Sequence, residues 1–102
     1  MKQHHYTITV QHITDKDGNS VNEPPLICDM PTHDNLADIL AKTDTNIVSG
    51  NDALRLALGL KLLGELILEN KNQAFFKELS PYFGEIMKIV KGRKSFRQPE
   101  KE

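Results

Sequence analysis

The sequence predicts an α+β domain in which an N-terminal β-hairpin packs on three to four C-terminal α-helices. Apolar and polar residues alternate over residues 5–13, and Leu26, Cys28 and Met30 are in phase over residues 26–30, which is the period of half-buried strands. After Pro31 the apolar residues recur every three to four positions, which is the period of helices. The chain has 102 residues, enough for one core and too few for two. We therefore expect a single domain over residues 1–92 and a flexible charged tail over residues 93–102.

The two predicted strands each place alternate apolar residues on one face. Cys28 shares its face with strand neighbours, so we expect it to be a small buried residue. Pro24 and Pro25 donate no backbone N–H and belong at the entrance of the second strand. Because a two-stranded ribbon is marginal alone and has two free edges, we expect it to pack on the helices or to pair with a second copy. The residues in phase are Tyr6, Ile8 and Val10 in the first strand and Leu26, Cys28 and Met30 in the second.

The helical part is predicted as four pieces with recognisable boundaries. A short helix begins after Asp34-Asn35, and the polar residues Thr43 to Asn46 end it. Ser49 and Asp52 resemble a capping box, which would open the longest helix, about Asn51 to Asn70. The other boundaries are Asn72 as the cap of a third piece, Ser80-Pro81 as the start of the last helix, and Lys91-Gly92 as its end.

The segment Ala53 to Leu68 has more apolar surface than one helix face needs. One stripe suits a core, and two further leucines fall among charged residues on the side expected to face solvent. Three small residues fall close together and would let another backbone approach. Two interpretations stay open, a central core helix and a subunit interface. The stripe is Leu56, Leu60, Leu63 and Ile67; the candidate interface is Leu58, Leu62, Ala53, Ala57 and Gly64.

The last helix carries two apolar stripes. We expect both to belong to the core, and the alternative is a groove for a peptide or a helix. The first stripe contains Phe76, Leu79, Phe83, Ile86, Met87 and Val90, and the second contains Phe75, Tyr82 and Ile89.

Charge argues against a dedicated nucleic-acid binder. Thirteen basic side chains against fourteen acidic ones give a formal net charge of -1. A basic cluster at the C-terminus nevertheless supplies candidate phosphate contacts, with Phe96 available to stack on a base. We favour the simpler interpretation, in which these cations complement the end of a helix and continue into a solubilising tail. The cluster is Lys88, Lys91, Arg93, Lys94 and Arg97.

Recognisable catalytic and metal-binding patterns are lacking. Asp15, Asp17 and Asn19 resemble the start of a calcium loop, but Ser20 and Leu26 occupy the positions that need glycine and glutamate. The four histidines lack the short paired spacing of zinc ligands, and Cys28 has no second cysteine nearby. The sequence has no glycine-rich phosphate loop and no nucleophile motif. We therefore expect no enzyme activity, no metal and no cofactor.

The expected compartment is the cytoplasm. The start of the chain has no apolar targeting segment. Arg55, Lys61 and Glu65 interrupt its longest apolar stretch, which argues against a membrane span. The single cysteine gives no sign of an oxidising compartment.

Three segments of the sequence form motifs of a known kind: His5-Tyr6-Thr7-Ile8-Thr9-Val10, Gly59-Leu60-Lys61-Leu62-Leu63-Gly64-Glu65 and Pro81-Tyr82-Phe83-Gly84-Glu85-Ile86-Met87. These segments resemble a family of short bacterial proteins catalogued only as a domain of unknown function. The resemblance covers roughly residues 4 to 92 and implies a bacterial cytosolic protein without an assigned activity. It carries over no catalytic or binding residue. The leading functional hypothesis is a non-enzymatic, homodimeric protein-interaction module, and the alternative is a nucleic-acid-associated protein.

Overall fold

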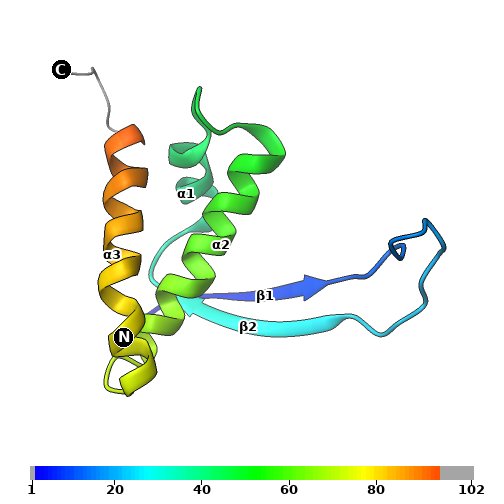
Figure 1. Cartoon of the computed structure of the whole chain (residues 1–102), viewed down its shortest axis with the longest axis horizontal. Coiled ribbons are helices and arrows are strands. Elements are labelled where there is room, and N and C mark those ends of the chain that lie inside the picture. The colour runs from blue at the N-terminus through cyan, green and yellow to red at the C-terminus, as the bar shows by residue number, and fades with distance from the viewer. Residues whose placement is uncertain (1, 95–102) are drawn as a thin grey trace. The chain divides into compact units, whose positions relative to one another are not determined.

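The computed structural model describes residues 2–94, with side chains as far as residue 92. Within these residues two strands are followed by three helices, so the predicted α+β class is confirmed (Figure 1). The chain forms two compact units, Met1–His33 and Asp34–Glu102, and each is described by itself. The elements are β1 His4–Val10, β2 Leu26–Thr32, α1 Leu36–Thr43, α2 Gly50–Glu69 and α3 Ala74–Lys94.

The N-terminal unit is an antiparallel hairpin whose register runs from the pair His4 and Thr32 to the pair Val10 and Leu26. Ile8 pairs with Cys28, so the predicted apolar face is present. The expected burial of Cys28 is wrong, because its side chain is exposed and Leu26 beside it is 72% exposed. The alternation of residues fixes which face a side chain occupies, but burial needs a second layer over that face.

The long loop of the hairpin is held by a tight turn. The carboxylate of Asp15 accepts hydrogen bonds from the backbone N–H groups of Asp17 and Asn19, each at 2.9 Å. Chiefly because of the bond from Asn19, the pKa of Asp15 lies below its usual value. Gly18 has a φ of 87°, which glycine adopts readily. The residues that resemble a calcium loop thus form a turn in which the carboxylate of Asp15 hydrogen-bonds to backbone groups of the turn itself.

The helix starts follow two different rules. At the start of α1, the Asn35 side chain accepts hydrogen bonds from the backbone of Ala37 and Asp38, as predicted. At the start of α2, Ser49 occupies the cap position, but its side chain makes no capping hydrogen bond. The predicted capping box is therefore wrong. Gly50, with a φ of 58°, opens the helix instead.

The predicted break at Ser80-Pro81 is also wrong. Pro81 lies inside α3, which continues unbroken from Ala74 to Lys94 and passes the predicted end at Gly92. A proline costs the helix one backbone hydrogen bond, which packing along the helix can offset. Because α3 is continuous, the apolar residues before and after Pro81 stay in register.

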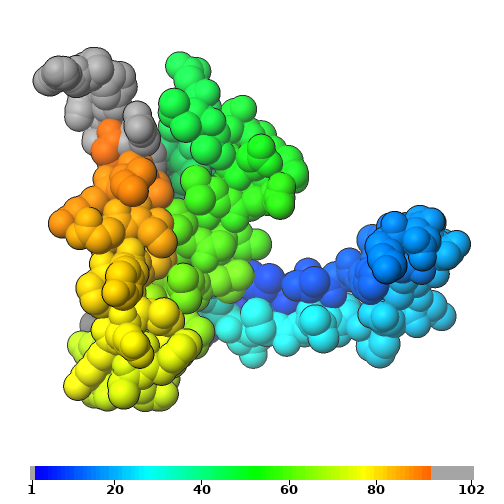
Figure 2. Space-filling model, viewed as in Figure 1, coloured from blue at the N-terminus to red at the C-terminus, as the bar shows by residue number. Residues whose placement is uncertain are grey.

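In the helical unit, α1 and α3 both pack against α2, and Figure 2 shows the atoms of α2 and α3 meeting along the two helices. Ala53, Ala57 and Ile67 of α2 are buried. The expectation that both stripes of α3 belong to the core is wrong for the second stripe and, within the first stripe, for Ile86, which is 45% exposed. The side chains of the second stripe face solvent in this unit, with exposed fractions of 60% for Phe75, 70% for Tyr82 and 64% for Ile89.

Candidate functional site

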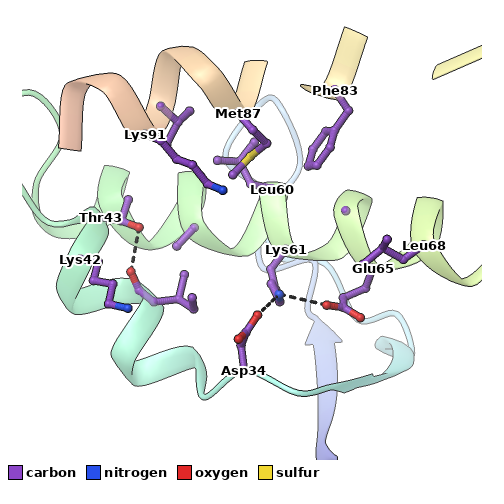
Figure 3. Close-up of a pocket in the computed structure, with 14 residues that line it drawn as sticks. Asp34, Lys42, Thr43, Leu60, Lys61, Glu65, Leu68, Phe83, Met87 and Lys91 are labelled. Carbon is purple, nitrogen blue, oxygen red and sulfur yellow. Dashed lines mark hydrogen bonds and ion pairs between the residues drawn. The ribbon is translucent and has the colours of Figure 1, made fainter. Parts of the chain in front are cut away.

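A cavity of about 370 Å³ lies among the three helices of the C-terminal unit (Figure 3). Its apolar lining comes from all three helices: Ile39, Ala57, Leu60, Gly64, Leu68, Phe83, Met87 and Val90. Its polar lining comes from the helices and the segment before α1: Asp34, Lys42, Thr43, Lys61, Glu65 and Lys91.

Small residues of α2 shape the floor of the cavity. Ala57 is buried, and Gly64 carries no side chain to fill the space between α2 and α3. A Cβ atom at Gly64 would lie 3.1 Å from Cζ of Phe83, which is tighter than ordinary van der Waals contact. The ring of Phe83 therefore packs directly over Gly64, and the glycine is needed for this close approach.

A three-membered ion cluster forms one wall. The Nζ atom of Lys61 donates to the carboxylate of Asp34 and lies 2.9 Å from Oε2 of Glu65 (Figure 3). Desolvation by burial is the largest influence on Lys61 and acts to lower its pKa. The hydrogen bonds and charges of Asp34 and Glu65 together outweigh it, so the pKa of Lys61 lies above its ordinary value. Lys61 is charged at neutral pH, and it ties α2 to the segment that leads into α1.

Two further lysines, Lys42 of α1 and Lys91 of α3, line the cavity (Figure 3). The side chain of Lys42 is exposed and, within the described part of the chain, makes no hydrogen bond or ion pair. The hydroxyl of Thr43 donates to the carbonyl of Ile39 at 2.8 Å and so is used within α1. The cavity therefore combines an apolar floor with cationic groups from two helices.

The predicted interface residues differ in how far they are buried. Ala53 and Ala57 are buried, so neither presents a surface to a partner in this structure. Gly64 lies beneath Phe83. Leu58 and Leu62 are half-buried, and their place in an interface stays a prediction. The structure thus brings two of the small residues, Ala57 and Gly64, together at the cavity floor.

The predicted phosphate contacts do not form one described cluster. Lys88 is exposed and lies 3.2 Å from Oε2 of Glu85, whereas Lys91 lines the cavity. Arg93 and Lys94 lie in the last turn of α3, where the side chains are outside the described residues. Arg97 lies outside the described residues altogether.

Candidate chemistry outside the cavity is sparse. Nδ1 of His12 lies 3.2 Å from Oε1 of Glu23, and both side chains are exposed. Over residues 2–94, no group of three histidine, cysteine or acidic side chains could hold a metal ion. Sequence reasoning missed Lys42, because a single lysine in a short helix carries no signal. The sequence pattern shows the seven-residue spacing of Phe75, Tyr82 and Ile89 but does not predict that these side chains are exposed.

Comparison with known families gives a match over most of the chain. The family described as a domain of unknown function with a solved structure, DUF3861, matches residues 4–92. The chain belongs to this family. The match confirms the resemblance seen in the sequence and covers the hairpin and nearly all of the helical unit. Neither the curated proteins nor the solved structures contain a match to the chain. In the part of the chain that the structure describes, every helix is too short or too polar to cross a membrane.

Proposed function

We propose that the protein is a non-enzymatic interaction module that forms a homodimer through one face of α3. The observation that carries the proposal is a stripe of exposed apolar side chains along this helix, called here the outer stripe: Phe75, Tyr82, Ile86 and Ile89. At about 100° per residue, these four positions fall within about 60° of arc. From Phe75 to Ile89 the stripe extends about 21 Å along the helix.

The extent of this surface supports a contact role. Among residues 34–92, the buried apolar side chains are Ala53, Ala57 and Ile67, so the helical unit encloses a small core. Leu66 and Leu68 of α2 are exposed as well. Monomeric proteins rarely keep large contiguous apolar patches in water, and such patches usually mark contact sites. A second copy would cover the stripe without requiring any other partner.

The spacing of the outer stripe is self-complementary. If two α3 helices pack antiparallel with Tyr82 at the two-fold axis, Phe75 faces Ile89 of the partner subunit. Leu79, which is half-buried, then lies beside Ile86 of the partner subunit. With Leu79 included, the apolar residues from Phe75 to Ile89 alternate four- and three-residue steps, the spacing by which two helices pack side by side.

Size-exclusion chromatography with multi-angle light scattering tests the proposal. The wild type should elute with twice the mass of the chain at micromolar concentration. Tyr82→Glu places two like charges at the two-fold axis and should give a monomer, because the dissociation constant of the dimer should rise at least tenfold. Ser80→Glu is the matched control, because it adds the same charge to an exposed position of α3 outside the outer stripe, and it should remain dimeric. Circular dichroism should show equal helix content in all three proteins.

Two results would overturn the proposal. One is a wild type that stays monomeric at the highest attainable concentration. The other is a dimer that Tyr82→Glu leaves intact, since the contact surface would then lie elsewhere. In that case Leu58→Glu and Leu62→Glu would test the interface predicted on α2.

The expected setting of the dimer is the cytoplasm. This part of the proposal rests on the single exposed Cys28, which would be prone to intermolecular disulfide formation in an oxidising compartment. Cell fractionation with a tagged chain tests it, and enrichment in an oxidising compartment would contradict it.

A further inference from the structure

We propose that the cavity among the three helices binds a small amphipathic carboxylate, with its apolar body against Leu60, Phe83 and Met87 and its charged end at Lys42. This site is separate from the outer stripe, so the inference does not rest on the proposed dimer. Three features of the cavity lead to it: its size, its apolar lining and the charge of Lys42.

The size suits a small organic molecule. Ligand pockets are typically about 300–1,000 Å³ and are lined mainly by apolar side chains with a few polar groups. The present cavity, about 370 Å³, lies at the lower end of this range. It therefore fits a compact ligand better than a peptide or a second helix. Apolar side chains from all three helices, Ile39, Leu60 and Met87 among them, would contact the body of such a ligand.

The charged residues of the lining determine which charge the ligand should carry. Three lysines and two carboxylates line the cavity. Asp34 and Glu65 both contact Lys61, so these carboxylates are already engaged with a cation. Lys42 has no ionic partner within the described residues, and Lys91 lines the cavity from α3. A carboxylate at this end would pair with Lys42, whereas an ammonium group would be repelled by it.

The apolar lining of the cavity determines that the ligand also has an apolar body. Simple anions such as acetate would satisfy Lys42 but leave the apolar lining at Phe83 and Met87 in contact with water. An apolar chain of several carbons would cover this surface, and each methylene group removed from water would strengthen binding. The combination of the two requirements is what defines the ligand class.

Isothermal titration calorimetry with sodium octanoate tests the inference. Octanoate should bind with one site per chain and should raise the melting temperature. Octanol has the chain without the charge, acetate has the charge without the chain, and octylamine reverses the charge. Octanol should bind about fivefold more weakly, and acetate and octylamine should show no saturable binding.

Two variants locate the binding site. Lys42→Met keeps the side-chain length and removes the charge, and it should weaken octanoate binding about fivefold while leaving octanol binding unchanged. Lys88→Met is the matched control, because Lys88 is an exposed lysine that does not line the cavity, and it should bind as the wild type does. Val90→Phe fills part of the cavity and should abolish binding of both octanoate and octanol.

Three outcomes would overturn the inference. Absence of saturable octanoate binding would show that the cavity takes no ligand of this class. Equal affinities for octanoate and octanol would show that the lysines do not select the ligand. Equal loss of affinity in Lys42→Met and Lys88→Met would show that any effect of lysine comes from the overall charge of the protein. Repeating the titration with Tyr82→Glu separates this result from the test of the dimer.

Discussion

The two apolar stripes of α3 have similar composition and opposite environments. The inner stripe, represented by Phe83, Met87 and Val90, is half-buried and faces the cavity beside α2. The outer stripe, which contains Tyr82 and Ile89, is exposed along the same helix. The two stripes are separated by about 100° around the helix, which is one residue step. Position around the axis, not residue type, therefore distinguishes them.

The difference shows what a helix face needs to become part of a core. The inner stripe meets a helix with small residues, and Gly64 leaves room for the ring of Phe83 within van der Waals distance. The outer stripe has no comparable surface opposite it within the helical unit. Shape complementarity from α2 thus decides which of two equally apolar faces is covered.

The largest expected effect separates the two stripes directly. In the monomeric Tyr82→Glu background, Phe83→Ala should lower the free energy of unfolding by about 2–3 kcal/mol, below the full cost for a buried phenylalanine since this ring is half-buried. Phe75→Ala should change it by less than about 0.5 kcal/mol, as for an exposed site. Urea denaturation followed by circular dichroism measures both. Similar losses at the two positions would mean that the outer stripe is also packed within the monomer.

Continuity of α3 keeps the two stripes in register and can be tested at Pro81. Pro81→Ala should raise the free energy of unfolding by about 2 kcal/mol, because the carbonyl of Lys77 gains a hydrogen-bond donor within the helix. Urea denaturation measures the change, and light scattering should show that the dimer persists. A loss of stability or of the dimer would show that both stripes depend on the proline.

The close contact beneath the inner stripe can be measured by comparing two glycines of α2. A Cβ at Gly59 meets nothing within 4 Å, so Gly59→Ala should stabilise the protein by about 1 kcal/mol through helix propensity. Gly64→Ala has the same intrinsic gain, but its Cβ presses against Phe83, so its net effect should be smaller by about 1 kcal/mol. Thermal denaturation of both variants gives the difference. Equal gains would show that Phe83 moves away at no cost.

The smallest effect concerns the polar wall on the other side of α2. The pKa of Lys61 is raised above 10.5 in the folded protein, so its ion pairs stabilise the fold fully below pH 10.5 and less as the pH rises through the folded pKa. Lys61→Met should therefore cost about 1 kcal/mol or less near neutral pH, and the difference from wild type should shrink at alkaline pH. Denaturation curves from pH 7 to pH 11 measure it, with Lys77→Met as an exposed control. A difference that does not change with pH would contradict the charge-based explanation.

The sequence by itself determined the elements that depend on local rules. The alternation around Ile8 and the prolines before Leu26 fixed the hairpin and its apolar face. Asn35 fixed the start of α1, because the cap and its partners are neighbours in the chain. The family match likewise follows from the sequence.

Tertiary structure decided the features that depend on what lies opposite a residue. In the folded protein α3 continues past Pro81, Ala53 is buried and Tyr82 is exposed. The spacing of apolar residues could not predict this difference, because it is the same in both stripes of α3. Tertiary structure also brought Lys42 to a cavity that no local pattern predicts. Periodicity records the direction in which a side chain projects from its own helix. Burial and binding depend on whether a second element of matching shape and charge meets it there, and for α3 the small residues of α2 meet only one of its two faces.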